Sequence, residues 1–540
     1  MNAAPAYDQL TARALEFEWL ADAVRPASAY GERSFAELRP FARGRENEAR
    51  ARALEIERMA AAVPERLDSI ADALRNAPDA LGAIARASMG EILDDADFLE
   101  VQRWCDAVER ADALLDGLRA GAGNAGVRAV REALESGRSG KFGFYLADEF
   151  EPGLAAARGE LQRRQAELDA LRGRAIERAA RELGRDDLTG DEFVVMRTDL
   201  PPVLPRGVRV LRDAPAYVLC ALDYGDDDVR ALERRDAAAA HAAACEERAR
   251  AHLSASIRER SGELLAAANA CGEIDVSIAA ARFSQRYDCR AAEIAGDATL
   301  TFEGGRFLPL AVRLEGEGRA FVPLDVDLHD VAALTGPNMG GKSVCLRTCG
   351  FVALCAALGL PVPARRARVA LFDDVAWLGA GADDDDRAGG LLSSFAREVV
   401  RVRDVLERPA QHRLVLLDEF ARTTTPAEAK ALLVALLERL RALGACGLAA
   451  THLAGVAEAA GVRHFAVRGL LGATGSAPPG DLQAALTALA AAMDYSIAEV
   501  RGEAAAGSDA LELAALLGLD QRLVGQARRH LEENWRSCSR

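Results

Sequence analysis

Residues 334–347 read Leu-Thr-Gly-Pro-Asn-Met-Gly-Gly-Lys-Ser-Val-Cys-Leu-Arg, and this stretch decides the fold of the second half of the chain. It fits the pattern G-x-x-x-x-G-K-[ST] and follows a short apolar segment, 331–334, that is typical of a buried strand. In this motif backbone N–H groups surround phosphates, Lys342 reaches the β and γ oxygens, and Ser343 is a ligand of Mg²⁺. The alternative, a glycine turn between a strand and a helix, leaves the complete motif unexplained. The sequence therefore predicts a nucleoside triphosphate site made by Gly336, Pro337, Asn338, Met339, Gly340, Gly341, Lys342, Ser343 and Val344.

A second motif, Leu-Val-Leu-Leu-Asp-Glu at residues 414–419, is an apolar strand that ends in two adjacent carboxylates. Asp418 is placed to hold Mg²⁺, directly or through water, and Glu419 is placed to polarise an attacking water molecule. Taken alone, acidic residues at a strand end are common in loops. Because this pair follows a complete phosphate loop in the chain, we interpret it as catalytic.

A third polar position, Thr451-His452, follows the apolar segment 444–450. An isolated histidine at the end of a strand is more often structural. Third in order behind two phosphate motifs, His452 is instead a candidate sensor of the γ-phosphate.

The composition limits the class of protein. The chain has 540 residues, half of them hydrophobic, and a net charge of −16 with a pI near 5.2, so we expect several domains. No signal peptide is recognised and the most apolar run, 350–361, is too short to cross a bilayer, so we expect a cytoplasmic protein without a membrane partner. The ten cysteines include no C-x-x-C pair and are interpreted as small buried residues. The acidic balance argues against a broad surface that grips nucleic-acid phosphates.

Periodicity divides the chain into four regions. Residues 1–150 are predicted to be helical, and 151–290 to hold two long helices, 151–183 and 229–269, around a β-rich tip at about 185–228. The segment 185–230 has six arginines and ten acidic residues, a net charge of about −4. Residues 291–490 alternate strands and helices from about 299 onward, as in a parallel α/β sheet with 331–334 and 414–417 as central strands. The remaining segment, 491–540, is predicted to be helical.

Four motifs together resemble the ATPase domain of the MutS family of mismatch-repair proteins. They are Thr-Gly-Pro-Asn-Met-Gly-Gly-Lys-Ser at 335–343, Ser-Ser-Phe-Ala-Arg-Glu at 393–398, Leu-Asp-Glu-Phe-Ala-Arg-Thr-Thr at 417–424 and Ala-Thr-His at 450–452. The resemblance covers about 321–455. It extends less strongly to 274–282 and 508–528.

The resemblance implies a multidomain chain in which a mainly α-helical lever and core region carries a small β-rich clamp tip and is followed by a P-loop, ABC-type α/β ATPase domain. The cofactors would be ATP and Mg²⁺, and the chain would act as a homodimer or paralogous heterodimer joined through 491–540. Ser393 would reach the γ-phosphate bound by the partner subunit, and Glu398 would support the loop that carries Ser393. Phe321 would stack on the adenine base.

The chain departs from the family pattern at three places. One is Phe321-Val-Pro-Leu324, where a family asparagine near the base-stacking aromatic residue is replaced. Ala421-Arg-Thr-Thr424 stands where the family has Gly-Arg-Gly-Thr, which stiffens this loop. Mismatch-repair members begin with a separate module that carries a Phe-x-Glu wedge, and we expect this protein to lack it, so we interpret Phe98-Leu-Glu100 as a chance match. Two functions therefore stay open: a dimeric ATP-gated clamp on DNA, or a protein-remodelling ATPase like the MutS-related proteins associated with reactivation of adenosylcobalamin-dependent lysine aminomutases.

Overall fold

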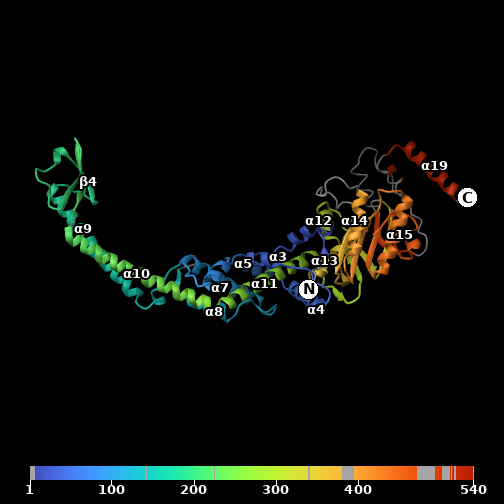
Figure 1. The fold of residues 1–540 in the computed structure, drawn as a ribbon, viewed down its shortest axis with the longest axis horizontal. Helices are drawn as coiled ribbons and strands as arrows, with labels where there is room; N and C mark the ends of the chain where they lie inside the picture. Colours follow the sequence, from blue (N-terminus) through green and yellow to red (C-terminus); the bar gives the residue numbers. More distant parts are fainter. Residues whose placement is uncertain are drawn as a thin grey trace. The chain divides into compact units, whose positions relative to one another are not determined.

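The computed structural model describes residues 6–139, 143–223, 225–337, 341–379, 394–470, 493–500, 511, 514–515 and 519–538 (Figure 1). Contacts divide the chain into two compact units. Unit 1 holds 1–75, 114–121 and 271–540, and unit 2 holds 76–113 and 122–270. The prediction of a multidomain chain with both helical and sheet-containing parts is confirmed.

A seven-stranded sheet forms the centre of unit 1, with the strand order β1-β12-β13-β14-β10-β15-β16. All neighbouring strands are parallel except β15 and β16. The prediction that 491–540 is helical is wrong at its start, because β16 pairs with β15 there. The strands are β1 (Ala6–Tyr7), β10 (Val331–Thr335), β12 (Asp374–Gly379), β13 (Arg413–Asp418), β14 (Cys446–Ala450), β15 (Arg463–Leu470) and β16 (Met493–Glu499). The two strands predicted to be central are both interior, and β14 lies between them.

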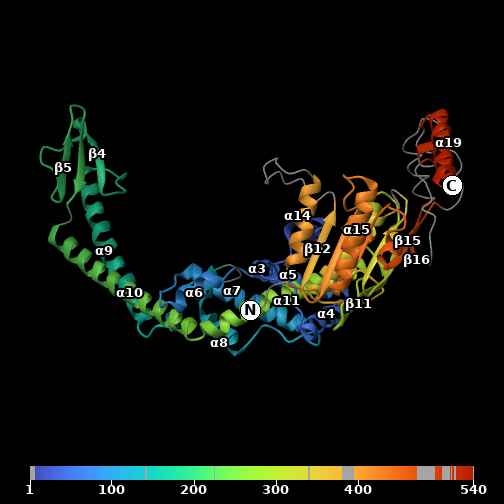
Figure 2. The ribbon, with the colours of Figure 1, turned by 45° about the vertical axis from the view of Figure 1, so that its right-hand side comes forward.

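Helices cover both faces of this sheet, as a parallel sheet requires. They are α13 (Lys342–Ala357), α14 (Ser394–Glu407), α15 (Pro426–Ala442) and α16 (Val456–Ala460). Two more helices of this half of the chain are α12 (Leu308–Gly316) and α19 (Gln521–Cys538). Val415 and Leu417 of β13 pack in one core with α14, α15 and α16, so these helices share one face of the sheet. Figure 2 shows α14 and α15 on this face. The alternate residue Leu416 faces α13, where a Cβ added to Gly350 would lie 2.9 Å from its Cδ1.

The start of the chain belongs to this sheet. We predicted a helical region over 1–150, but β1 is a parallel edge strand beside β12. α1 (Gln9–Ala14) follows it, and the hydroxyl of Thr11 accepts a hydrogen bond from the backbone N–H of Trp377 at 3.0 Å. A two-residue strand has no periodicity, so the pattern could not reveal it.

A separate four-stranded sheet has the order β7-β11-β8-β9. Its strands are β7 (Glu293–Ala295), β8 (Leu300–Gly305), β9 (Leu324–Leu328) and β11 (Arg366–Ala370). β8 is antiparallel to both β9 and β11, so the expectation of a parallel sheet from residue 299 onward is wrong for this part. The alternation of buried and exposed residues in β9 is the signal of a sheet with one face in solvent.

The remaining helices of unit 1 lie early in the chain, with one exception. They are α2 (Phe17–Ala23), α3 (Ala29–Ala36), α4 (Glu46–Ala60), α5 (Pro64–Arg75) and α11 (Ser261–Tyr287). The exception is α11, whose first residues, up to 270, belong to unit 2 and whose later residues belong to unit 1. Among the described residues α11 alone is long and apolar enough to cross a membrane, but 72% of its most apolar window is buried, as in a core helix. Asp275 of α11 is 1% exposed, and its carboxylate accepts hydrogen bonds from the N–H of Ala27 and the N–H and Oγ of Ser28, at 3.0, 2.7 and 2.6 Å.

Unit 2 consists of helices and two small sheets. Its helices are α6 (Leu81–Ser88), α7 (Asp95–Leu115), α8 (Ala125–Leu134), α9 (Leu154–Leu183) and α10 (Gly225–Glu259). The hairpin β2 (Arg138–Ser139) and β3 (Gly143–Phe144) adds to the strands missed in 1–150. Phe98 is buried in α7, with its ring 5.4 Å from that of Phe144.

Two long helices of unit 2 lead to a three-stranded sheet, the tip sheet, with the order β4-β6-β5 (Figure 1). Its strands are β4 (Glu192–Met196), β5 (Val208–Asp213) and β6 (Tyr217–Leu222). α9 and α10 lie side by side through a small core that includes Leu154 and Cys245. The second long helix was predicted as one piece over 229–269, which is wrong. It ends at Glu259 and α11 begins at Ser261, whose hydroxyl bonds the carbonyl of Arg258.

The Asp275 contacts predict a measurable effect on stability. Asp275→Ala leaves buried donors at the start of α3 without an acceptor, and we expect unit 1 to lose about 3 kcal/mol of unfolding free energy. Asp275→Asn, which keeps one acceptor oxygen, should lose less. Urea denaturation measures both, and amide exchange at Ala27 and Ser28 should accelerate in Asp275→Ala. Equal stability of the Ala variant and the unsubstituted protein would contradict this role.

Candidate functional site

The phosphate-loop motif connects the end of β10 to the start of α13. Gly336 has φ of 152° and Gly341 has φ of 88°, conformations that favour glycine. A Cβ at Gly336 would lie 2.9 Å from Cβ of Val467, and one at Gly341 would lie 3.2 Å from Cδ1 of Tyr495. Both glycines are therefore required by backbone conformation and by close neighbours.

Three predicted loop residues, Asn338, Met339 and Gly340, lie outside the described residues. Of the others, Pro337 precedes this gap. Val344 is half-buried in the first turn of α13, where the N–H groups have no partner in their own helix and are available to an anion.

The side chain of Lys342 turns back over the loop. Its Nζ donates hydrogen bonds to the carbonyl oxygens of Gly336 at 3.0 Å and Pro337 at 3.1 Å, and the residue is only 6% exposed. Burial lowers the pKa of Lys342, while the nearby carboxylates of Glu419 and Asp418 act in the opposite direction. The ammonium group is thus held at the place where the loop would surround a phosphate.

Ser343 and Asp418 meet at the ends of their elements. Oγ of Ser343 donates to Oδ1 of Asp418 at 2.9 Å, across 75 positions of sequence. Burial raises the pKa of Asp418 and the charge of Glu419 adds to this, while the Ser343 hydrogen bond opposes it. A Cβ at Gly379 would lie 2.5 Å from the carbonyl oxygen of Asp418, so β12 leaves no room for a side chain there.

This oxygen pair fits the ligand chemistry of Mg²⁺. Hydroxyl and carboxylate oxygens are the donors that this cation prefers, and it usually takes few protein ligands together with substrate phosphates. Among the described residues no group of three or more His, Cys, Asp or Glu side chains could hold a metal ion. Ser343 and Asp418 therefore suit a cation that is shared with a phosphate ligand.

The loop after β13 carries Glu419 in an unusual backbone conformation. Glu419 has φ of 55° and Ala421 has φ of 62°, each costing about 1 kcal/mol for a residue with a Cβ. The N–H of Glu419 donates to the carbonyl of Ala450 at 3.0 Å. The N–H of Ala421 donates to Oε2 of Glu398 on α14, also at 3.0 Å.

Thr451 and His452 lie in the turn that follows β14. The N–H of buried Thr451 donates to the carbonyl of Leu334, and its Oγ1 accepts from the N–H of Leu453 at 3.1 Å. The side chain of His452 is exposed. Phe321 is half-buried in the loop before β9, and Ser393 lies outside the described residues.

The structure therefore brings four predicted side chains together: Lys342, Ser343, Asp418 and Glu419. Among the described residues, neither His452 nor Phe321 makes a hydrogen bond or ion pair with these four.

One neighbour of the site was not predicted. Nε2 of His464 on β15 lies 2.7 Å from Oγ1 of Thr335, the residue before Gly336. Burial lowers the pKa of His464, which favours the neutral ring. The sequence offered little signal for it, because a lone histidine inside a strand belongs to no motif.

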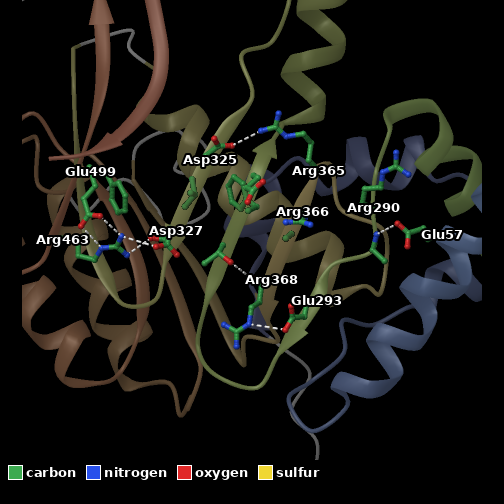
Figure 3. A pocket seen from close by; sticks show the side chains of 17 residues that line it. Glu57, Arg290, Glu293, Asp325, Asp327, Arg365, Arg366, Arg368, Arg463 and Glu499 are labelled. Carbon is green, nitrogen blue, oxygen red and sulfur yellow. Dashed lines mark hydrogen bonds and ion pairs between the residues drawn. The ribbon is translucent and has the colours of Figure 1, made fainter.

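A groove of about 850 Å³ lies elsewhere, on the open face of the four-stranded sheet (Figure 3). Its charged side chains of both signs are mostly paired with one another, as in the contacts of Arg463 with Glu499 at 3.1 Å and with the carbonyl of Asp327 at 2.7 Å. In the sheet register Arg463 lies opposite Ala332, near the start of β10. The groove is therefore at the end of β10 away from the phosphate loop.

Residues 332–533 match the sequence profile of MutS domain V. Endonuclease MutS2 of Pelotomaculum thermopropionicum is 37% identical over 206 residues, which cover 37% of this chain and 25% of that protein. DNA mismatch repair protein MutS of Granulibacter bethesdensis is 33% identical over 261 residues, which cover 45% of this chain and 27% of that protein. DNA mismatch repair protein MutS of Dinoroseobacter shibae is 30% identical over 341 residues, which cover 62% of this chain and 36% of that protein. The matched part is thus about a quarter to a third of each relative. By this profile and these relatives, the chain belongs to the MutS family and carries its domain V.

Proposed function

We propose that the protein is a MutS-family ATPase of the P-loop, ABC type that binds and hydrolyses ATP. The observation that carries the proposal is the convergence of Lys342 and Ser343, at the start of α13, with Asp418 and Glu419, at the end of β13. A lysine, two oxygens that suit a cation and a second carboxylate beside a glycine-lined helix N-terminus are the groups that phosphoryl transfer requires.

In the proposed reaction the oxygen of a water molecule attacks the γ-phosphorus of ATP. The bond from this phosphorus to the β–γ bridging oxygen breaks, and ADP and inorganic phosphate leave. Glu419 orients the water and accepts its proton, and Lys342 stabilises the charge on the β and γ oxygens. Ser343 and Asp418 would hold Mg²⁺, which supplies charge neutralisation at the phosphates.

The first candidate function is an ATP-gated dimeric clamp on DNA. The relatives' names, which refer to an endonuclease and to DNA mismatch repair, support it. We place the dimer contact in 491–540, as a homodimer or a paralogous heterodimer, with Ser393 completing the partner's site. We further propose a cytoplasmic location and no membrane partner.

The tip sheet favours the second candidate, a protein-remodelling ATPase such as a reactivase for an adenosylcobalamin-dependent lysine aminomutase. In the β4–β6 register Val194 lies opposite Leu219 and Met196 opposite Tyr217, on the face away from the core of the tip. Val194 and Met196 are 43% and 49% exposed. Apolar side chains gain from burial against a protein surface and gain little against phosphates.

The charge of the tip supports the same alternative. On the face that carries Leu219, β5 contributes Arg212 opposite Leu219. Arg209 lies opposite Ala221, two residues further along β6. These two arginines stand in a segment, 185–230, whose net charge is about −4. A DNA-contacting surface normally has a clear basic excess.

Substitution of Lys342 tests the binding part of the proposal. Lys342→Ala removes a charge-assisted contact to the phosphates, worth about 3 kcal/mol, so we expect ATP affinity to fall about 100-fold. Equilibrium binding of a fluorescent ATP analogue measures this change. Lys430→Ala on α15 is the matched control and should bind normally. Unchanged affinity of Lys342→Ala would contradict the assigned site.

Substitution of Glu419 tests the chemical step. Glu419→Ala should bind ATP with affinity near that of the unsubstituted protein, while kcat falls at least about 100-fold, because the water loses its base. Phosphate release measures the rate, and Glu438→Ala, an exposed position of α15, is the control. Normal turnover by Glu419→Ala would reject this role.

A salt titration decides between DNA and protein as the clamped partner. The full-length protein is titrated with duplex, mismatched and branched DNA at several salt concentrations. A DNA clamp should lose affinity with a log–log slope of about −0.9 for each phosphate neutralised. A slope near zero, or no binding at low salt, would contradict the DNA function and leave the protein-remodelling function.

A further inference from the structure

The loop that carries Glu419 depends on an unusual residue two positions later. Ala421 is fully buried and has φ of 62°, a left-handed conformation that an alanine rarely adopts. Phe420 before it is 7% exposed and packs in the core with Val405 of α14. Packing therefore holds the loop in a backbone conformation that is unfavourable for alanine.

The backbone N–H of Ala421 has its partner on a different element. Oε2 of Glu398 accepts this hydrogen bond at 3.0 Å, across 23 positions of sequence. A buried N–H that lost its acceptor would be unsatisfied, so this contact favours the left-handed conformation of Ala421. Glu398 lies in the second turn of α14, which begins at Ser394.

α14 itself is fixed against the sheet. Val402, Val405 and Leu406 pack in the core that also contains Phe420 and Ala421. Nη2 of Arg401 lies 3.2 Å from Oδ1 of Asp8, which holds the same helix to the beginning of the chain. The carboxylate of Glu398 is thus presented to the loop from a rigid support.

We propose that Glu398 is a positioning residue for the catalytic carboxylate of Glu419. By holding Ala421 in the left-handed conformation, Glu398 fixes the path of the chain from Glu419 to Ala421 and keeps the Glu419 carboxylate beside Lys342 and Asp418. Without this hydrogen bond Ala421 returns to an ordinary conformation and Glu419 leaves its position. The inference rests on the proposed ATPase function, since it assigns a role relative to the base of that reaction.

Two substitutions of Glu398 test the inference in the full-length protein. Glu398→Ala should lower kcat for ATP hydrolysis about 10- to 100-fold, because the base is misplaced, and leave KM for ATP within about twofold. Glu398→Gln keeps an acceptor oxygen and should retain most of the activity. Glu407→Ala, on the same helix and exposed, is the matched control. An unchanged kcat in Glu398→Ala, or an equal loss in Glu398→Gln and Glu398→Ala, would overturn the inference.

Two double substitutions separate positioning from a general structural effect. In a Glu419→Ala background, Glu398→Ala should cause no further loss of the residual rate, since its effect passes through Glu419. In an Ala421→Gly background, Glu398→Ala should cost less than in the unsubstituted chain, because glycine adopts the left-handed conformation readily. Additive losses in both backgrounds would overturn the inference. If the unsubstituted protein hydrolyses no ATP, the proposed function fails; if it does and Glu398→Ala is equally active, only the positioning role fails.

Discussion

The site depends on one constraint, the parallel direction of β10 and β13 on either side of β14. In the register of the sheet Leu334 and Asp418 both lie opposite Ala450, so the two strands end at the same level. Two backbone hydrogen bonds fix the same alignment. The N–H of Thr451 donates to the carbonyl of Leu334, and the N–H of Glu419 donates to the carbonyl of Ala450. Because the strands end together, Ser343 and Asp418 can form a hydrogen bond at 2.9 Å. Antiparallel strands would carry these residues to opposite edges.

The edge of this sheet is completed by the beginning of the chain. Asp374 and Arg413 form a buried ion pair at 3.1 Å. The guanidinium of Arg408 lies 3.0 Å from the carboxylate of Asp374 and 3.2 Å from that of Asp8, so it links the two. Removing one member of a buried network leaves an uncompensated charge, so the network strongly disfavours detachment of the N-terminal segment. β1 and α1 therefore belong to the same structural unit as α14 and β13, although more than 360 residues separate them in the sequence.

The sequence predicted what is encoded locally. The motif around Lys342 and the carboxylates after β13 could be found because each lies in a short segment with a characteristic order of residues. The long helix α9 was visible for the same reason, through its periodicity. The break at Arg260, the strand β1 and the pairing of β8 with β11 could not be read in this way, since each is decided by contacts between distant segments. The hydrogen bond between Glu398 and Ala421 belongs to this second class, because no local pattern joins residues on different elements.

The charges of the site determine which ligand can occupy it. Burial disfavours the charged forms of both Lys342 and Asp418, and Glu419 adds a second carboxylate close by. A triphosphate alone would bring further negative charge next to these carboxylates, at a cost that grows as water is excluded. A divalent cation would reverse the sign of this interaction, since the carboxylate and hydroxyl oxygens of Asp418 and Ser343 would become its ligands. The proposed function therefore requires a nucleotide and a cation to bind together. In the structure the ammonium group of Lys342 donates hydrogen bonds to the carbonyl oxygens of Gly336 and Pro337, and in the proposed complex the phosphates would be its acceptors.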